Sequence, residues 1–474
     1  MKFYITTPIY YVNDKPHIGH AYTTITADVL ARHHREQGDE VFLLTGTDEH
    51  GSKIAEAAQK AGQEPQEFCD SIASNFQETW RRLNISNDKF IRTTDKEHIK
   101  AVQKFVVALK GADALYEKEY EGLYCSGCEK FLTDKELVNG KCPDHNIKPK
   151  KIKEKNWFFK LSEYLPKIKK LIESDKIKVG PAHIKKEVLS LISKQELPDF
   201  SFSRRKVSWG IELPWDKDQT VYVWADALPN YISAIGYENN QKQFEEWWNN
   251  AQVSHFMAKD ILKFHAIYWP AMLLAADIKV PENVYAHGFF TINGQKMSKT
   301  LGNFINPIDL VDKFGIDATR YLLLSQFPFG QDGDISEKRF IEKYNADLAN
   351  NLGNLISRAS NLIEKSKLEF RNFKVKSDKF EKQIDELYSD FRFDEVLKLI
   401  WQKIDEANLY LNKKEPWKIK DKDKLKKIFS KLIIDIQKIA KALVPFMPET
   451  AEKILEQFSQ PKIKKQEILF PRIK

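Results

Sequence analysis

Near the N-terminus, the motif His17-Ile18-Gly19-His20 combines two imidazoles and a glycine where a strand is followed by a helix. The β-branched and aromatic run 2–7 predicts a buried strand, and 21–37 has helical spacing. In an open α/β sheet, this junction is where helix N-terminal N–H groups hold phosphates. Imidazoles donate hydrogen bonds to phosphate oxygens, and Gly19 lets a flat base approach the backbone. The motif therefore predicts a nucleotide site, although an isolated match is more often incidental.

A second basic motif, Lys296-Met297-Ser298-Lys299, follows a predicted strand at 284–290 and an Asn-Gly turn. Two lysines three residues apart suit a clamp on phosphates, because lysine is a compact charge that can follow a leaving anion. Taken alone, the motif is better explained as a solvated basic loop. Asp48 ends the predicted strand 40–45 at the sheet edge where ligands collect, and a turn or N-cap role explains it equally well.

Four potential metal ligands form two C-x-x-C/H knuckles, with thirteen residues between the pairs: Cys125, Cys128, Cys142 and His145. Thiolates and imidazole in this arrangement make a tetrahedral Zn²⁺ set with no open position. The sequence therefore predicts one structural zinc that holds a small subdomain, and not a catalytic metal.

The order of predicted elements indicates several domains in the 474 residues. Strand–helix alternation predicts a parallel sheet with crossover helices. The alternation breaks near residue 115 and resumes near 220, and from about 317 helices dominate with no further strand predicted. We expect five segments. The first half of a catalytic domain covers 1–114, a connective insertion with the zinc knuckle covers 115–220, and the second half of the catalytic domain covers 221–292. A lysine-loop and stem-contact region at 293–345 and a helical domain at 346–474 follow.

The net charge of +8 lies entirely in the last quarter of the chain, where 346–474 holds 28 Lys+Arg and 20 Asp+Glu. A polyanion such as RNA is one explanation, and a lysine-rich solvated helix surface is another. The apolar runs are too short to span a bilayer, and the N-terminus opens into a strand without a signal or transit pattern. A cytoplasmic location is expected.

In order and spacing, these motifs resemble the class I aminoacyl-tRNA synthetases, and among them the methionyl-tRNA synthetases with a single zinc knuckle. The motifs at 17–20 and 296–300 resemble the two class I signatures, and their joint occurrence around a zinc-bearing insertion is far more specific than either alone. The resemblance implies an α/β fold: a Rossmann-type parallel-sheet catalytic domain with a zinc-bearing insertion, followed by an all-α anticodon-binding bundle. It also implies that L-methionine reacts with ATP to give methionyl-adenylate and pyrophosphate, and that the methionyl group then passes to the 3′-terminal adenosine of tRNA(Met).

The resemblance further implies roles for individual residues. Catalytic contacts to the phosphates come from His17, His20, Lys296 and Lys299. ATP-binding positions are Pro8, His17, Gly19, His20, Asp260, His287, Gly288 and Lys299. The methionine pocket is formed by Ile9, Tyr11, Asp48, Trp224, Ala227, Tyr231, Ile261 and His265. In this pocket Asp48 binds the ammonium group, and Tyr11 and His265 offer polar atoms to the thioether. The anticodon is read by Asn354, Arg358 and Trp417. Mg²⁺ accompanies ATP, and a monomer is expected because no appended tRNA-binding barrel follows residue 474.

The sequence departs from the resemblance at two positions, and three alternatives compete with it. Ala225 and Ala258 stand where relatives carry a larger apolar residue and a glycine, so a different local pocket shape is expected there. A class I synthetase for another small apolar amino acid is disfavoured, because the branched-chain enzymes have a larger insertion and the cysteine enzyme needs zinc in its substrate pocket. A non-catalytic synthetase-like RNA-binding protein would be expected to lose signature residues. An adenylating enzyme without RNA would not need the helical domain.

Overall fold

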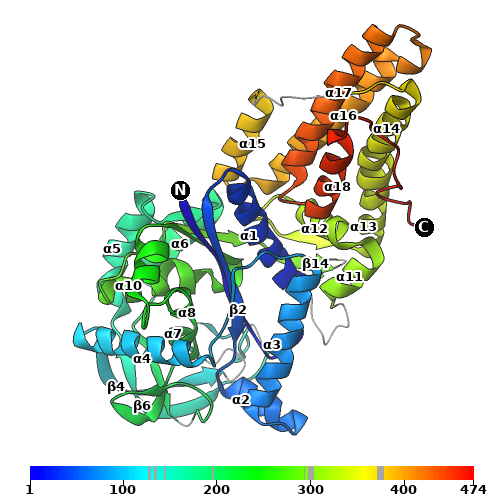
Figure 1. Ribbon diagram of the computed structural model, residues 1–474. Helices are drawn as coiled ribbons and strands as arrows, with labels where there is room; N and C mark the ends of the chain where they lie inside the picture. Colours follow the sequence, from blue (N-terminus) through cyan, green and yellow to red (C-terminus); the bar gives the residue numbers. More distant parts are fainter. Residues whose placement is uncertain are drawn as a thin grey trace. The chain divides into compact units, whose positions relative to one another are not determined.

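The fold is described from a computed structural model of the chain (Figure 1). The structure describes residues 1–125, 130–132, 136–143, 146–194, 197–205, 207–292, 294–296, 304–370 and 378–474. The chain forms two compact units. The first unit contains Met1–Pro16, Gly38–Trp80 and Ser86–Ala286, and the second contains His17–Gln37, Arg81–Ile85 and His287–Lys474.

A six-stranded sheet forms the centre of the first unit, with strand order β3-β2-β1-β12-β13-β7. The strands are β1 (Lys2–Tyr11), β2 (Glu40–Asp48), β3 (Lys89–Arg92), β7 (Lys178–Gly180), β12 (Gln252–Ala258) and β13 (Asn283–His287). The pairings of β1 with β2 and β12, of β2 with β3 and of β13 with β7 are parallel. Tyr4 and Ile5 of the central strand are fully buried, as expected for a strand covered on both faces. The predicted Rossmann-type sheet is confirmed.

Helices cover this sheet and fill the core with aromatic side chains such as Trp248 and Trp269, both fully buried. They are α2 (Ser52–Ala61), α3 (Pro65–Arg82), α4 (Lys96–Gly111), α5 (Leu161–Glu173), α6 (Ala182–Ser193), α7 (Val223–Ala227), α8 (Asn230–Ser233), α9 (Gln241–Phe244) and α10 (Trp269–Ala275). Short 3₁₀ and π-helical turns occur at Lys259–Ile261, Glu245–Asn249 and Phe264–Tyr268. The segment expected as an insertion also contributes β7, which is an edge strand of the central sheet.

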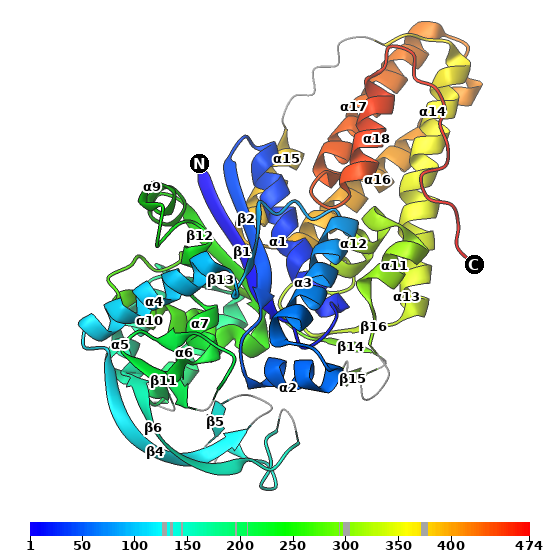
Figure 2. The same ribbon diagram turned by 60° about the horizontal axis from the view of Figure 1, so that its bottom comes forward.

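The segment expected as the insertion also contains antiparallel sheet, and Figure 2 shows its long β4–β6 ribbon. One sheet has the order β5-β4-β6-β8 and the other the order β10-β11-β9. Their strands are β4 (Leu115–Cys125), β5 (Lys130–Leu132), β6 (Lys150–Phe159), β8 (Phe200–Ser201), β9 (Ser203–Arg205), β10 (Glu212–Leu213) and β11 (Asp216–Val221). Ion pairs such as Glu117–Lys155 and Glu119–Lys153 cross the ribbon, which suits a solvated sheet face.

The second unit is mainly helical, and its last helices lie side by side as a bundle (Figure 1). Its helices are α1 (Ile18–Glu36), α11 (Pro307–Phe314), α12 (Ile316–Leu324), α13 (Glu337–Lys343), α14 (Asn354–Ser366), α15 (Lys379–Ser389), α16 (Phe393–Lys414), α17 (Lys422–Leu443) and α18 (Pro448–Ser459), with a π-helical stretch at Tyr344–Gly353. The predicted helical domain is therefore confirmed. None of the helices in the described ranges is long and apolar enough to cross a membrane.

The absence of strands after residue 317 was a wrong prediction. β16 (Gly333–Ile335) pairs in parallel with β14 (Phe290–Ile292), which also pairs with β15 (Gln295–Lys296). Three residues are too few to show a strand period, and the pairing partner lies more than forty residues earlier in the chain. A Cβ at Gly333 would lie 1.8 Å from the ring of Phe327, so only glycine fits at this position of the strand.

A buried guanidinium joins four parts of the second unit. Arg320 of α12 is fully buried and donates to Oδ2 of Asp28 in α1 at 2.6 Å. Its other N–H groups donate to the backbone carbonyls of Leu83 and Asn84, before β3, and of Pro445 and Phe446, between α17 and α18. Because these groups account for all five guanidinium donors, the helix that begins after His17 is held to the bundle by one satisfied charge.

Candidate active site

His17 and His20 form the N-terminal cap of α1. His17 Nδ1 accepts from the backbone N–H groups of Gly19 (3.0 Å) and His20 (3.4 Å), and His20 Nδ1 accepts from the N–H of His17 (3.3 Å). The rings are stacked with centroids 3.6 Å apart. Burial lowers the pKa of His17 to about 4, and burial and the neighbouring His17 lower the pKa of His20. Both rings are therefore neutral at pH 7, and the proton of each lies on Nε2, where it can be donated.

The segment after the lysine motif packs against this cap. The backbone N–H of Ile18 donates to the carbonyl of Ile305 at 3.2 Å, and the ring of Phe304 lies edge-on to His17 with centroids 5.8 Å apart. Lys296 ends β15, whereas Lys299 lies outside the described residues. The residues that follow the second motif therefore contact the histidine cap.

His287 links β13 to α1. Its Nε2 lies 2.6 Å from Oγ1 of Thr23, and its Nδ1 lies 2.7 Å from the carbonyl of Gly288. Since a carbonyl can only accept, Nδ1 carries the proton, and Nε2 accepts from the Thr23 hydroxyl. Burial lowers the pKa of His287 to about 4. Both ring nitrogens are engaged within the protein, so a nucleotide contact from His287 would use its ring face or backbone.

Three other predicted ATP positions lie at strand ends or bends. A Cβ at Gly288 would lie 2.3 Å from the backbone of Gln331, so only glycine fits there. Asp260 lies in the 3₁₀ turn directly after β12 with an exposed side chain. Pro8 is a buried position of β1, just where the pairing register with β2 shifts. Each of these residues stands at the end of a strand or in the bend of one.

The predicted methionine-pocket residues all belong to the first unit. Tyr11 and Asp48 are opposite each other at the carboxyl ends of β1 and β2. Tyr231 lies 2.7 Å from His265 through its hydroxyl and Nε2, and Trp224 stacks on Phe264 with centroids 3.9 Å apart. The remaining positions, Ile9, Ala227 and Ile261, are buried or half-buried in the same unit.

The expectation that His265 offers a polar atom to the thioether is not supported by the geometry. His265 Nδ1 donates to the carbonyl of Ile261 at 3.0 Å, so its Nε2 accepts the hydroxyl proton of Tyr231. Burial lowers the pKa of His265 to about 4, in agreement with a neutral ring. Both nitrogens are used within the protein, and the role left to His265 is to orient Tyr231.

Two buried charge clusters behind Asp48 were not predicted from the sequence. Glu49 is fully buried and accepts two hydrogen bonds from Arg92, at 2.7 and 2.9 Å. Asp226, also fully buried, lies 2.7 Å from His50 Nδ1 and 3.0 Å from His98 Nε2. Burial alone would raise the pKa of Asp226, but the charge and hydrogen bonds of the histidines outweigh it and lower the pKa. The sequence signal that could have indicated these clusters is the pair Glu49 and His50, which directly follows Asp48.

Two of the four predicted zinc ligands lie within the described residues. Cys125 ends β4, and Cys142 follows the bridge between Val138 and Lys141. Both are buried in a small apolar cluster with Leu132, and neither forms a disulfide. Cys128 and His145 lie outside the described residues, and no group of three or more potential ligands is found in the rest. Two buried thiols in a subdomain with so small a core fit the chemistry of a structural zinc.

The predicted anticodon residues lie on the helical bundle. Asn354 and Arg358 are one turn apart on α14, where Asn354 is exposed and Arg358 donates to Oδ1 of Asn412 on α16 at 2.8 Å. Trp417 lies in the 3₁₀ turn after α16, and 49% of its side chain surface is exposed. An exposed indole is a surface available for stacking.

Comparison with known proteins identifies the class first. The family model of class I tRNA synthetases of the methionine type, described as "tRNA synthetases class I (M)", matches residues 3–151 and 145–360, and the model "Anticodon-binding domain of tRNA ligase" matches 370–472. Together with the parallel sheet and the histidine cap, these matches define a class I aminoacyl-tRNA synthetase.

Individual relatives narrow the assignment. The methionine–tRNA ligases of Clostridium acetobutylicum and Rickettsia conorii are 41% and 39% identical, over 100% and 99% of this chain and 78% and 95% of their own. The structure of Mycobacterium tuberculosis methionyl-tRNA synthetase in complex with methionyl-adenylate is similar with a TM-score of 0.92 and 33% identity, over 99% of this chain and 100% of that chain. The chain belongs to the methionine–tRNA ligase family and is an aminoacyl-tRNA ligase, as the motifs predicted.

Proposed function

We propose that the chain activates L-methionine with ATP and transfers it to tRNA(Met). In the first step, a methionine carboxylate oxygen bonds to the α-phosphorus of ATP, the bond to the bridging oxygen breaks, and pyrophosphate leaves. In the second step, the methionyl group passes to the 3′-terminal adenosine. The observation that carries this proposal is the contact of the His17–His20 cap with the segment that follows the lysine motif.

The neutral histidine pair suits phosphate binding during the first step. With Nδ1 of His17 and His20 occupied by backbone N–H groups, the two Nε2–H groups are donors with fixed direction. Because the nucleophile belongs to the substrate, no protein base is needed, and catalysis consists of positioning and charge stabilisation. Lys296 and Lys299 would hold the leaving pyrophosphate. ATP enters with Mg²⁺, which offsets part of the phosphate charge.

Recognition of methionine is assigned to the first unit. Asp48 would bind the ammonium group by charge-assisted hydrogen bonds, while Trp224 and Ile261 enclose the side chain. The orientation of Tyr231 by His265 supports a fixed polar contact near the thioether. Ile9, Tyr11 and Ala227 complete this pocket. The nucleoside part of ATP would lie against Pro8, Gly19, Asp260, His287 and Gly288.

The remaining sites serve folding and tRNA recognition. One zinc held by Cys125, Cys128, Cys142 and His145 would stabilise the insertion, and its role is structural because four ligands leave no open position. Asn354, Arg358 and Trp417 would read the CAU anticodon through amide, guanidinium and indole groups. We further propose the five-segment domain division given above, a monomer, and a cytoplasmic location.

Charging of tRNA tests this proposal directly. Purified protein is incubated with ATP, radioactive methionine or leucine, and tRNA that carries a CAU anticodon. Methionine alone should be esterified, and a tRNA with one changed anticodon base should be a matched poor substrate. Charging with leucine would overturn the pocket assignment, and equal charging of both tRNAs would overturn the anticodon assignment.

A further inference from the structure

The buried carboxylate of Asp226 connects two elements of the first unit that lie far apart in the sequence. Its Oδ2 lies 2.7 Å from Nδ1 of His50, which follows β2, and its Oδ1 lies 3.0 Å from Nε2 of His98 in α4. Burial by itself would raise the pKa of Asp226, but the charge and hydrogen bonds of the two histidines outweigh burial and lower this pKa. The carboxylate is therefore ionised at neutral pH and can only accept, so both imidazole N–H groups donate to it.

The chain of hydrogen bonds continues from His98 into α8. Nδ1 of His98 lies 2.8 Å from Oγ of Ser233, and both residues are buried. Ser233 is the last residue of α8, which also carries Tyr231. The backbone carbonyl of Tyr231 accepts from the hydroxyl of Tyr4 in β1 at 2.7 Å. The short helix α8 is therefore attached to the central sheet through Tyr4 and to Asp226 through His98.

Each segment that this network connects carries part of the proposed methionine pocket. Asp226 shares the single turn of α7 with two pocket residues, His50 lies two positions from a third, and Ser233 lies two positions from a fourth. These pocket residues are, in that order, Trp224 and Ala227, Asp48, and Tyr231. The carboxylate thus links the group assigned to the ammonium of methionine with the walls assigned to its side chain.

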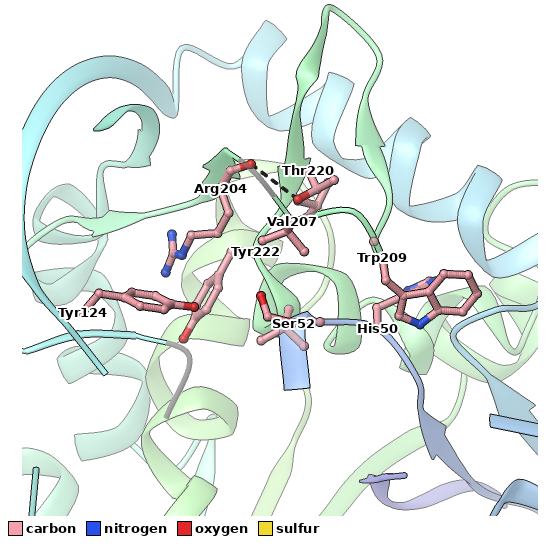
Figure 3. A pocket seen from close by; sticks show the side chains of 12 residues that line it. His50, Ser52, Tyr124, Arg204, Val207, Trp209, Thr220 and Tyr222 are labelled. Carbon is pink, nitrogen blue, oxygen red and sulfur yellow. Dashed lines mark hydrogen bonds between the residues drawn. The ribbon is translucent and has the colours of Figure 1, made fainter. Parts of the chain in front are cut away.

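His50 is also fixed on the side away from Asp226. The ring of Trp209 lies edge-on to the His50 ring with centroids 5.5 Å apart (Figure 3). Trp209 Nε1 donates to the carbonyl of Glu49 at 2.5 Å, and the N–H of Gly51 donates to the carbonyl of Trp209 at 3.0 Å. The cavity that His50 lines has a volume of about 20 Å³, which is room for about one water molecule and not for an amino acid. An effect of His50 on methionine binding is therefore expected to act through its neighbours in the network.

Stability alone does not explain why three ionisable side chains occupy this interior position. Burial of charged groups costs desolvation energy that can exceed the gain from pairing, and apolar side chains of similar volume often stabilise a core as well or better. A fully hydrogen-bonded polar network does, however, specify one arrangement of the elements that it joins. Here those elements are the end of β2, α4, α7 and α8.

We propose that Asp226, His50 and His98 are positioning residues that hold the ammonium site and the side-chain walls of the methionine pocket in one mutual geometry. This inference rests on the proposed function and deepens it. Methionine must contact both parts of the pocket at once, so a change in their spacing weakens its binding. The residues proposed to bind ATP lie outside this network, and ATP binding should be independent of it.

Amide side chains test the two hydrogen bonds to Asp226 separately, because the amide nitrogen of Asn takes the place of Nδ1 of histidine and that of Gln takes the place of Nε2. His50→Asn and His98→Gln therefore keep the donor to Asp226, whereas His50→Gln and His98→Asn lose it. In ATP–pyrophosphate exchange, we expect KM for methionine to stay within about twofold in the first pair. It should rise about tenfold or more in the second pair, where a hydrogen bond to a charged group is lost, with a smaller change in kcat. KM for ATP should stay within about twofold in all four variants.

Leu109→Ala is the matched control for a fold that is merely less stable. Leu109 is fully buried in the apolar core on α4, eleven residues after His98. Its truncation should lower the urea midpoint of unfolding without raising KM for methionine. The His50 pair carries the test by itself if the His98 variants do not fold, because His50 lies at the end of the network.

Three results would overturn the positioning role: equal KM for methionine in the Asn and Gln variants of each histidine, an equal rise in Leu109→Ala, or a parallel rise of KM for ATP. A lower KM for methionine in His50→Gln than in His50→Asn would also contradict it, because Nε2 of His50 would then be the atom that matters. Failure of the proposed function is distinguishable from these results, because the unmodified protein would then show no methionine-dependent exchange.

Discussion

Neutralising Asp28 should loosen the second unit strongly. Its Oδ2 accepts from Nη2 of Arg320 at 2.6 Å and from Nε of Arg32 at 2.8 Å, and the side chains of Asp28 and Arg320 are fully buried. Breaking a buried ion pair by removing one charge costs about 3–5 kcal/mol. Asn keeps an acceptor, so for Asp28→Asn we expect the lower end, about 3 kcal/mol, or roughly a hundredfold in the opening equilibrium.

Amide hydrogen exchange measures this loss of stability in α1, α12 and α18, where we expect it. The matched control is Glu342→Gln, which removes the exposed pair of Lys338 and Glu342 at 3.9 Å. Such a helix-surface pair contributes about 0.3–0.5 kcal/mol. A cost of less than about 1 kcal/mol for Asp28→Asn would contradict a stabilising role of this ion pair, because Arg320 would then be held by its carbonyl partners alone.

Four further predictions concern the proposed sites. Lys299→Ala should lower the adenylation rate about a hundredfold in single-turnover assays with little change in methionine affinity, and an effect on affinity alone would contradict a role in the transition state. Cys142→Ser should reduce zinc from one ion per chain to none in metal analysis and lower the unfolding temperature, whereas fully folded, metal-free native protein would disprove the structural zinc. Trp417→Ala should reduce tRNA charging at least fivefold and leave methionine-dependent ATP–pyrophosphate exchange unchanged. A parallel loss of charging and exchange would argue against anticodon stacking. Because burial lowers the pKa of His17 and of His265 to about 4, the unfolded chain binds protons below pH 6.5 that the folded protein does not. Stability in urea should therefore fall by about 1.4 kcal/mol per pH unit for each histidine as the pH drops from about 6.5 toward 4, and a flat profile would be inconsistent with neutral rings.

The sheet edge and the position of the histidine motif before a helix could be predicted because their signals are local. Buried-strand patterns at 2–7 and 40–45 indicate β1 and β2, at whose carboxyl ends Tyr11 and Asp48 lie opposite each other, and the helical period of 21–37 places His17 before α1. The residue types at these positions, imidazoles and a carboxylate, then indicate which ligand groups they can bind. The helical identity of the last quarter was predictable for the same reason, since amphipathic spacing persists over many turns in α16 and α17.

Features that depend on contacts distant in the sequence were not predictable. β16 exists because β14 offers a partner, and the hydroxyl of Tyr231 bonds to Nε2 of His265, 34 residues later in the chain. The π-helical turn Phe264–Tyr268 likewise carries no sequence period of its own. Asp28 and Arg320 lie 292 residues apart, and only the folded structure shows that their charges meet.

The two signature motifs, with the proposed pocket of Asp48, Tyr231 and His265, should activate methionine and no other amino acid. ATP–pyrophosphate exchange measures this with purified, folded protein that is offered methionine, leucine, isoleucine, valine and cysteine separately. We expect exchange with methionine alone. Exchange with another amino acid would keep the fold and contradict the pocket, and no exchange with any of the five would contradict the catalytic role of both motifs.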